Sequence, residues 1–491
     1  RWSGGLGDVY KRPAYESGAR WFERTLAMID ESGPTSLGWS ESATRVRVQL
    51  AEAEAVSGNA VEARRHSLEA ARAAIVADDP ATIVAALRVR ARHSFSAIDP
   101  DDPERVEVLR AALSMGSLDT WQRAALLGEL AKELIFRRDI DGRRRALEAQ
   151  DVLIDQLPLV ERVQLVATAG ATSYVCAPRR VLELRCDEAE AVLDGEESLS
   201  GSQRWRILGH LAYTALHLGD RHRFDRAVDG MQALRDRTGA VRDSMTLLHE
   251  TMRSTIDGRL VDAQGSADEL VDGLERLGVP EALSYRWTTT LAISRERDAL
   301  DGLRPVLDGL ERGGHPAGPE RATAALVRLL RGDLDGVRGA LRDLDSEEFA
   351  DDATMQLCIA YWAEIVAGLR SERHCVDFID RLSVTSGVNL LIGGLYLGPV
   401  DRLLGLLHHA VGAHERADLL FSAAVEQQTA LRSPAWVART RLDWAAALLE
   451  RRERQRATEM LAAAAAAMGD LDLAESRRRH GELVGQLELI S

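Results

Sequence analysis

The chain has 491 residues, enough for roughly two to four globular domains or one long repeat array. Hydrophobic residues make up 45% and charged residues 28%, a balance that excludes an intrinsically disordered chain. The formal net charge of −15 repels phosphate backbones, so we expect no direct contact between this segment and nucleic acid.

The cysteine and hydropathy patterns favour a cytoplasmic protein. The four cysteines, Cys176, Cys186, Cys358 and Cys375, contain no CxxC pair and match no zinc-binding spacing. No run of about 18 apolar residues occurs and no apolar secretion signal stands at the N-terminus, so we expect no membrane contact. We also expect no cofactor and no metal ion. The start at Arg1 and the arginine-rich, lysine-poor composition indicate a fragment or a trimmed chain from a GC-rich bacterial genome.

Taken in chain order, the sequence predicts pairs of amphipathic helices. Apolar residues recur at i, i+3, i+4 and i+7, which is the period of a helix, and convincing strand patterns are nearly absent. Short breaks with glycine separate the expected helices, because glycine adopts the left-handed conformation that ends a helix. The breaks recur about every 35–40 residues, a spacing typical of stacked helical hairpins. They are Gly58-Asn59, Gly219-Asp220, Gly258-Arg259, Gly332-Asp333 and Gly412-Ala413.

The packing positions of a tetratricopeptide-like (TPR-like) hairpin are clearest near the C-terminus. In the segment from Leu404, small residues let two helices approach closely and Phe421 fills the groove between them. A following unit repeats the pattern between Trp444 and Ala464. The segment's positions are Leu404, Gly405 and His408 on the first helix, Gly412 at the turn, and Ala417, Phe421 and Ala424 on the second.

We therefore predict an all-α fold, a right-handed α-solenoid of about twelve TPR-like helical hairpins. A single hairpin cannot bury its apolar face alone, so neighbouring hairpins must stack on one another. We place a divergent repeat array at residues 1–386 and regular C-terminal repeats at residues 387–491. Joints rich in proline or glycine are expected near 99–103 and 313–319, and a third at the irregular apolar segment Val384–Gly398.

One expected helix carries a stripe of polar and aromatic residues. Arg206, His210, Tyr213 and His217 fall at i, i+4, i+7 and i+11, which places them on one face. Since the first helix of a hairpin usually lines the concave side of such a superhelix, the stripe is a candidate for groove contacts with a peptide or a small ligand. An ordinary solvated helix face is the alternative. In both cases the stripe faces solvent, so replacing the two histidines and the tyrosine together by alanine should change stability little.

No catalytic pattern is present, so we expect that the chain is not an enzyme. The sequence contains no GxxxxGK[S/T] phosphate-binding loop and no HExxH motif, and no order of nucleophile and base can be argued from it. Arginine clusters at 143–145, 451–456 and 477–479 are flanked by acidic residues and lack interleaved aromatic residues. This pattern favours solvated helix faces over contacts with nucleic acid.

Several stretches resemble a known family. Leu397–Gly405 (LGPVDRLLG), His414–Ala417 (HERA) and Arg432–Thr440 (RSPAWVART) resemble the C-terminal repeat region of bacterial signal-transduction ATPases with numerous domains, the STAND ATPases. Ala14–Leu26 (AYESGARWFERTL) resembles the first repeat after such an ATPase module. The family includes actinobacterial LuxR-type and MalT-like transcriptional regulators and ATPase-linked adenylate cyclases. The ATPase module itself and a LuxR-type helix-turn-helix have no counterpart in this sequence.

The resemblance implies a role in signal transduction. The segment would be the non-catalytic arm of a multidomain regulatory ATPase or transcriptional regulator, sensing an effector or binding a partner protein. A protein, peptide or small effector in the concave groove would shift the parent protein between autoinhibited and active states. Two alternatives stay open. One is a stand-alone interaction adaptor, with oligomers possible through the C-terminal repeats, and the more remote one is an α-solenoid enzyme with convergent acids in a closed pocket.

Overall fold

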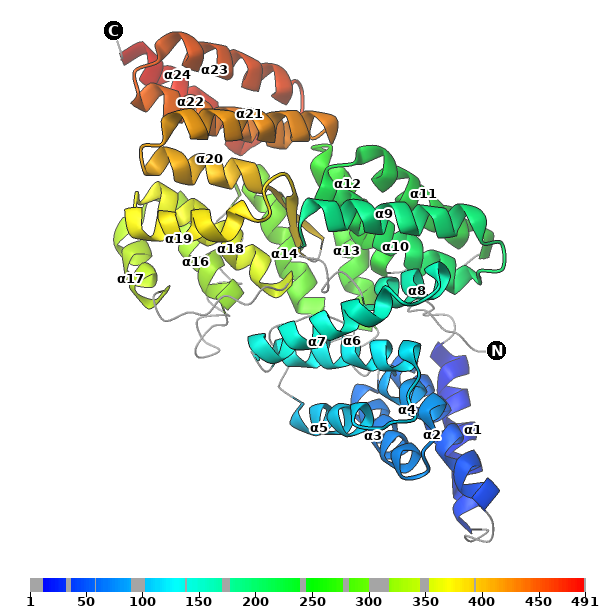
Figure 1. Ribbon diagram of the computed structural model, residues 1–491. Helices are drawn as coiled ribbons and strands as arrows, with labels where there is room; N and C mark the ends of the chain where they lie inside the picture. Colours follow the sequence, from blue (N-terminus) through cyan, green and yellow to red (C-terminus); the bar gives the residue numbers. More distant parts are fainter. Residues whose placement is uncertain are drawn as a thin grey trace.

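A computed structural model describes residues 12–31, 37–57, 59–89, 102–136, 139–169, 177–238, 244–276, 282–299, 318–344, 353–392 and 394–489. Within these ranges the chain forms 23 helices and one pair of strands, which confirms the predicted all-α helical-repeat fold. In Figure 1 the helices up to residue 154 lie at the lower end of an elongated molecule, those of residues 159–296 and 318–383 lie beside one another in its middle, and those of residues 400–489 lie at its upper end.

The first part of the chain contains fourteen described helices: α1 (Arg12–Glu31), α2 (Leu37–Ser57), α3 (Ala60–Val76), α4 (Pro80–Leu87), α5 (Pro103–Leu113), α6 (Thr120–Phe136), α7 (Ile140–Ile154), α8 (Leu159–Ala169), α9 (Arg179–Gly195), α10 (Gly201–Leu218), α11 (Arg221–Thr238), α12 (Ser244–Ile256), α13 (Leu260–Arg276) and α14 (Ala282–Glu296). The second part contains α16 (Gly318–Leu330), α17 (Leu334–Leu344), α18 (Ala353–Gly368), α19 (Glu372–Ser383), β1 (Asn389–Ile392), β2 (Leu395–Pro399), α20 (Val400–Ala410), α21 (His414–Ala430), α22 (Pro434–Glu450), α23 (Arg454–Met468) and α24 (Ala474–Leu489).

The even-numbered helices form one layer, which we call the inner layer. Each of these contacts the next even-numbered one from α2 to α14, and again from α16 to α24. Odd-numbered helices such as α3, α7, α11, α21 and α23 pack on the outside of their partners as the second helix of a hairpin. This arrangement is the stacking that amphipathic hairpins need in order to bury their apolar faces.

The predicted glycine breaks end helices as expected. Gly219, Gly258, Gly332 and Gly412 all have positive φ angles, between 73° and 82°. At Gly219 the backbone N–H donates to the carbonyl of Leu216, and the next N–H donates to the carbonyl of Ala215, so two carbonyls at the end of α10 are satisfied. The remaining predicted break has Gly58 outside the described residues.

The segment expected to be an irregular joint, Val384–Gly398, instead contains a buried β-hairpin. β1 and β2 pair antiparallel, with Leu391 opposite Tyr396 and a bulge between Leu390 and Leu391. The hairpin lies between α10, α12 and α14 on one side and α18 and α20 on the other (Figure 1). The expectation of a joint here is wrong, because this segment is a buried part of the core. Both faces of the hairpin are buried, so its sequence lacks the alternation of polar and apolar residues by which a strand is predicted.

The chain also closes on itself. α22 contacts α12, and α24 contacts α14, so the C-terminal repeats return to helices more than 150 positions earlier in the sequence. The largest core cluster accordingly runs from Val48 to Trp436. The domain division at residue 386 stays a prediction, and the hairpin just beyond it packs on helices of both predicted arrays.

The two other predicted joints fall largely outside the described residues. Residues 99–101 and 313–317 are not described. Asp102 accepts a hydrogen bond from the backbone N–H of Arg105 and thereby caps α5, and Gly318 begins α16. Among the described residues, no helix combines the length and the apolar character that crossing a bilayer requires.

The predicted packing of the C-terminal hairpin is visible at Gly405 on α20. A Cβ atom added there would lie 2.9 Å from two ring carbons of Phe421, which is fully buried on α21. The small residue therefore lets the aromatic ring sit directly against the neighbouring backbone, as the TPR-like pattern predicts.

Replacing Gly405 by alanine should destabilise the protein by about 1–3 kcal/mol, because the added methyl group overlaps the Phe421 ring. Gly481 on α24 is the matched control, since nothing lies within 4 Å of its added Cβ. Gly481→Ala should be neutral or stabilise by about 0.5–1 kcal/mol through helix propensity. Urea denaturation followed by circular dichroism measures both, and equal effects would contradict this packing.

Candidate functional site on the inner layer

The candidate stripe lies on α10, a helix whose ends are defined by its sequence. Ser200 and Gln203 form a reciprocal capping box at the N-terminus, and Gly219 ends the helix in the left-handed conformation. Between these ends, nearly every residue from Ile207 to Leu218 is buried. α10 therefore has apolar contacts on one face and lies against the β-hairpin on the other.

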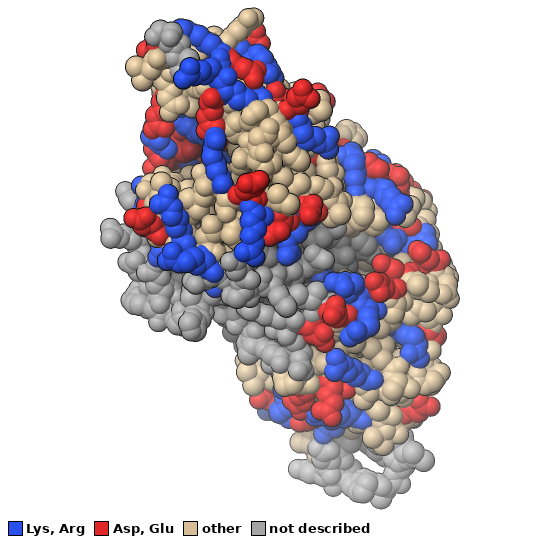
Figure 2. Space-filling model, turned by 60° about the vertical axis from the view of Figure 1, so that its left-hand side comes forward, with Lys and Arg blue, Asp and Glu red and all other residues tan. Residues whose placement is uncertain are grey.

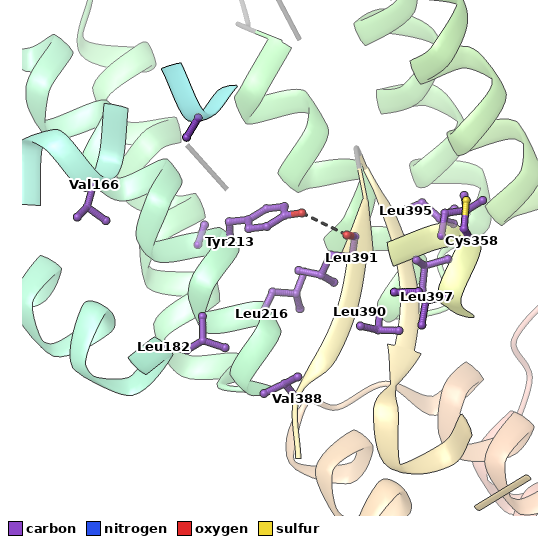
Figure 3. Packing of buried hydrophobic residues seen from close by; sticks show 14 of the residues in the cluster. Val166, Leu182, Tyr213, Leu216, Cys358, Val388, Leu390, Leu391, Leu395 and Leu397 are labelled. Atoms are coloured by element: carbon purple, nitrogen blue, oxygen red, sulfur yellow. Dashed lines mark hydrogen bonds between the residues drawn. The ribbon is translucent and has the colours of Figure 1, made fainter. Parts of the chain in front are cut away.

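Three of the four stripe residues are not open to solvent. His210, Tyr213 and His217 are only 8%, 9% and 2% exposed, which corrects the expectation of a solvent-facing stripe. For two of them the physical reason is that β1 covers them: Tyr213 Oη donates to the carbonyl of Leu391 at 3.3 Å, and His217 Nδ1 lies 2.6 Å from the carbonyl of Asn389. Figure 3 shows the tyrosine ring directed at Leu391 beside the packed leucines of the hairpin. The expectation that their replacement would leave stability unchanged no longer holds.

Side chains from several helices complete the hydrogen bonds of the hairpin. Gln356 on α18 accepts from the backbone N–H of Leu391 at 2.8 Å, and Asn389 donates to the carbonyl of Leu216 at 2.8 Å. Gln427 on α21 donates to the carbonyl of Gly387 at 3.0 Å. Because a two-stranded ribbon leaves unpaired backbone groups along its outer edges, burying it requires such polar partners.

Burial keeps the two histidines of the stripe neutral. Desolvation, together with the charge of Arg185, lowers the pKa of His210 to about 4. Desolvation also lowers the pKa of His217 to about 4, against the opposing effect of its hydrogen bond to the Asn389 carbonyl. With a proton on Nδ1 for that bond, the buried Nε2 of His217 has no hydrogen-bond partner among the described residues.

The fourth stripe residue, Arg206, lies in a different environment. It lines a hollow of about 360 Å³ between α4, α6, α8 and the first turns of α10. Arg88 at the C-terminus of α4 and Trp121 on α6 also line it, together with the polar side chains of Gln164 and Gln203. Sequence analysis did not single out Arg88 or Trp121, since they lie on separate helices about 85–118 residues before Arg206. Contact of the stripe with an outside ligand stays a prediction.

A chain of buried ion pairs crosses the inner layer at the other end of the molecule. Glu364 on α18 binds Arg295 of α14 at 2.6 Å and Arg402 of α20 at 2.7 Å. Arg402 also binds Asp443 of α22, which binds Arg479 of α24, both at 2.6 Å. Burial alone would raise the pKa of Glu364, but Arg295 and Arg402 hold it well below its usual value. In this series each carboxylate lies between two arginines, so both buried acidic groups are paired, which suits a structural role.

The aromatic ring of Trp436 joins this series to the hairpin. The guanidinium carbons of Arg439 and Arg402 lie 4.7 and 5.7 Å from its ring centroid, and Tyr396 of β2 contacts it edge-on. Gly398, with a φ of 92°, leaves room for the tryptophan against the strand, where any side chain would collide with the ring. The hairpin and the ion pairs thus form one continuous interior.

The arginine clusters pair with acidic side chains. Arg451 and Arg456 both bind Asp418 of α21 at 2.8 Å, and Arg456 also binds Glu453 at 2.6 Å. Figure 2 shows lysine and arginine interspersed with aspartate and glutamate over the visible face rather than gathered in one field. Such a surface lacks the continuous positive strip that tracks a phosphate backbone.

Two of the described cysteines are poorly suited to act as nucleophiles. Cys186 and Cys375 are buried, and desolvation raises the pKa of their thiols to about 12 and about 11. At neutral pH they are therefore protonated and weakly nucleophilic. Across the described ranges, no group of three or more His, Cys, Asp or Glu side chains is arranged to hold a metal ion.

Replacing Arg402 should show how much unfolding free energy is lost when the buried ion pairs are broken. Arg402→Met leaves Glu364 and Asp443 without their shared partner, and we expect a loss of about 3–5 kcal/mol in unfolding free energy. Arg338→Met is the control, because its pair with Asp335 is exposed and should contribute less than about 1 kcal/mol. Chemical denaturation of both variants measures the difference, and a loss for Arg402→Met no larger than that of the control would contradict this interpretation.

The stability of the protein should fall as the pH drops below about 6.5. In the unfolded chain His217 takes up a proton near its ordinary pKa of 6.5, whereas in the folded chain it stays neutral down to about 4. Its contribution, at most about 3.5 kcal/mol, is therefore complete above pH 6.5 and is lost between pH 6.5 and 4. His217→Gln keeps a hydrogen-bond donor without titrating, so its unfolding midpoint should vary less between pH 7 and 5.

The exposed His222 serves as the control for this pH dependence. His222→Gln makes the same replacement at an exposed position on α11, so any change that it shares with His217→Gln is not specific to the buried site. Identical profiles for both variants and the unaltered protein would show that His217 is not buried in a neutral form.

No family model and no curated protein matches this chain. Among solved structures, the chain is similar to a protein described as "Circular tandem repeat protein with novel repeat topology and enhanced subunit contact surfaces". The alignment covers 98% of this chain and 94% of that chain, with 14% sequence identity and a TM-score of 0.12. A TM-score this low does not establish a shared fold, so the helical-repeat assignment follows from the helices and contacts described above.

Proposed function

We propose that this helical-repeat chain is the non-catalytic, effector-sensing arm of a multidomain regulatory ATPase. The observation that carries the proposal is a hollow in the inner layer, next to a region that the chain's own hairpin and ion pairs occupy. The chain's own hairpin and ion pairs fill the space between α10–α14 and α18–α24, while the hollow beside Arg206 stays open between α4, α6, α8 and α10.

This division favours a small effector over a long peptide as the ligand. A peptide that followed the whole concave face would have to displace β1 from Tyr213 and His217, which are bonded to its carbonyls. A ligand in the hollow needs no such displacement. It would contact four helices of the inner layer at once and change their relative stability, which is the requirement for coupling to a distant module.

The ATPase context is supported by the sequence resemblance alone. The stretches 14–26 and 397–440 resemble the repeats that follow an ATPase module, and they lie near the two ends of the described chain. In such an arrangement the arm supplies recognition and the module supplies the chemistry. The activity of the parent protein would then depend on which state of the arm the effector favours.

The test is a comparison of ATP hydrolysis by the parent protein with and without residues 1–491. If the arm holds the parent in an autoinhibited state, its deletion should raise basal hydrolysis several-fold and abolish the response to effector. Arg180→Gln, which changes an exposed arginine of α9, serves as a control that should leave basal hydrolysis unchanged. Unaltered hydrolysis and regulation after deletion would refute the proposal, as would a coding sequence with a start codon directly before Arg1 and no ATPase module.

A further inference from the structure

The β-hairpin lacks the apolar pattern that usually fixes the alignment of a strand. Both faces of β1 and β2 are buried, and most of their side chains are leucines with at most 4% exposure: Leu390, Leu391, Leu395 and Leu397. A shift by one residue turns every side chain of a strand to the opposite face. Where both faces are apolar, such a shift exchanges one leucine for another. The alignment must therefore be defined by something other than apolar burial.

Asn389 is a polar residue of the hairpin with partners on two sides. It begins β1, and its side chain is fully buried. Its Nδ2 donates to the carbonyl of Leu216 on α10 at 2.8 Å, and its Oδ1 accepts from Tyr396 Oη of β2 at 2.8 Å. Its backbone carbonyl lies 2.6 Å from His217 Nδ1. One residue thus joins the two strands to each other and to α10.

The bond to Leu216 belongs to the C-terminal end of α10. Within a helix each carbonyl accepts from the N–H four residues later, and the last four carbonyls lack this partner. Leu216 lies in this last turn, where the N–H of Gly219 donates to it at 3.1 Å. Gly219 also lets the hairpin come close, because an added Cβ would lie 3.4 Å from Asn389 Nδ2. A carboxamide placed one or two turns earlier would meet carbonyls already bonded within the helix.

A shifted hairpin would leave this carboxamide without its partners. One unpaired polar group in a buried interior lowers the population of a state roughly 10- to 100-fold, whereas the surrounding leucines lose little. A single buried asparagine fixes the register of coiled-coil helices for the same reason. A shift by two residues would also move β1 by about 7 Å along α10 and so change how much of that helix it covers.

We propose that Asn389 determines the register of the buried hairpin, because it allows only one alignment of β1 against α10 and against β2. It supplies a unique conformation more than stability, since the apolar neighbours already hold the hairpin in the interior. This role goes beyond the proposed function: it concerns the interior of the chain and holds whether or not the chain is a sensing arm. Tyr213 bonds to β1 at one residue only, Leu391, so its environment reports the register.

The test is fluorine NMR of the 491-residue chain labelled with fluorotyrosine, which replaces its seven tyrosines. Single Tyr→Phe variants assign the signals of Tyr213 and Tyr396. Asn389→Leu keeps the size of the side chain but removes both of its hydrogen bonds. The variant should stay helical by circular dichroism, while the signals of both tyrosines split or broaden, because the population of shifted registers rises at least about tenfold.

Two further variants separate register from the simple loss of a hydrogen bond. Gln356→Leu removes the side-chain bond to the N–H of Leu391 but leaves Asn389 in place, so each tyrosine should keep one sharp signal. Tyr396→Phe removes only the bond to Asn389 Oδ1, and the Tyr213 signal should then gain a weaker second component.

Three results would overturn the proposal. The first is one sharp signal for each of the two tyrosines in Asn389→Leu, and the second is equal splitting in Gln356→Leu. The third is loss of the helical circular dichroism signal in Asn389→Leu, because the residue would then be required for stability and not for register.

Discussion

The structure depends on burying a β-hairpin inside a helical solenoid. A short ribbon has free N–H and C=O groups along its outer edges, and at this position nearly all of its residues are buried. The polar residues of the surrounding helices meet this demand: Tyr213 and His217 from α10, and Gln356 from α18. Their hydrogen bonds explain why polar side chains stand on an otherwise apolar inner face, and they join early and late repeats into one interior.

The buried ion pairs extend the same constraint through the C-terminal half. Arg295, Glu364, Arg402, Asp443 and Arg479 come from five different helices, so each pair crosses from one repeat to another. Replacing such a series by apolar residues need not weaken a protein, but breaking one member leaves an uncompensated charge. The alternation therefore fixes the relative positions of these helices more than it adds to overall stability.

The helical repeat could be predicted from sequence because its signals are local. The helix period and the glycine at positions such as 219 and 412 depend on neighbours within one turn of chain. Other turns could not be predicted, because residues other than glycine adopt the left-handed conformation there and the sequence does not indicate it. These are Asp78, Asp298, Arg370, Arg432 and Arg452, with φ between 51° and 62°. Periodicity does not encode contacts between distant segments. Such contacts produce the hairpin's burial and the closure of α24 on α14, and they bring Arg88 and Arg206 to the same hollow.

The register between β1 and α10 explains why the hollow exists where it does. Asn389 lies against His217 and Leu391 against Tyr213, so two residues of strand, about 7 Å, match four residues of helix, about 6 Å. Strand β1 ends at Ile392 and reaches little further along the helix. Arg206 lies two turns beyond Tyr213, roughly 10 Å along the axis, and is therefore past the end of the ribbon. The polar stripe is longer than the strand that covers part of it, so its first residue, Arg206, lines the hollow instead of the hairpin.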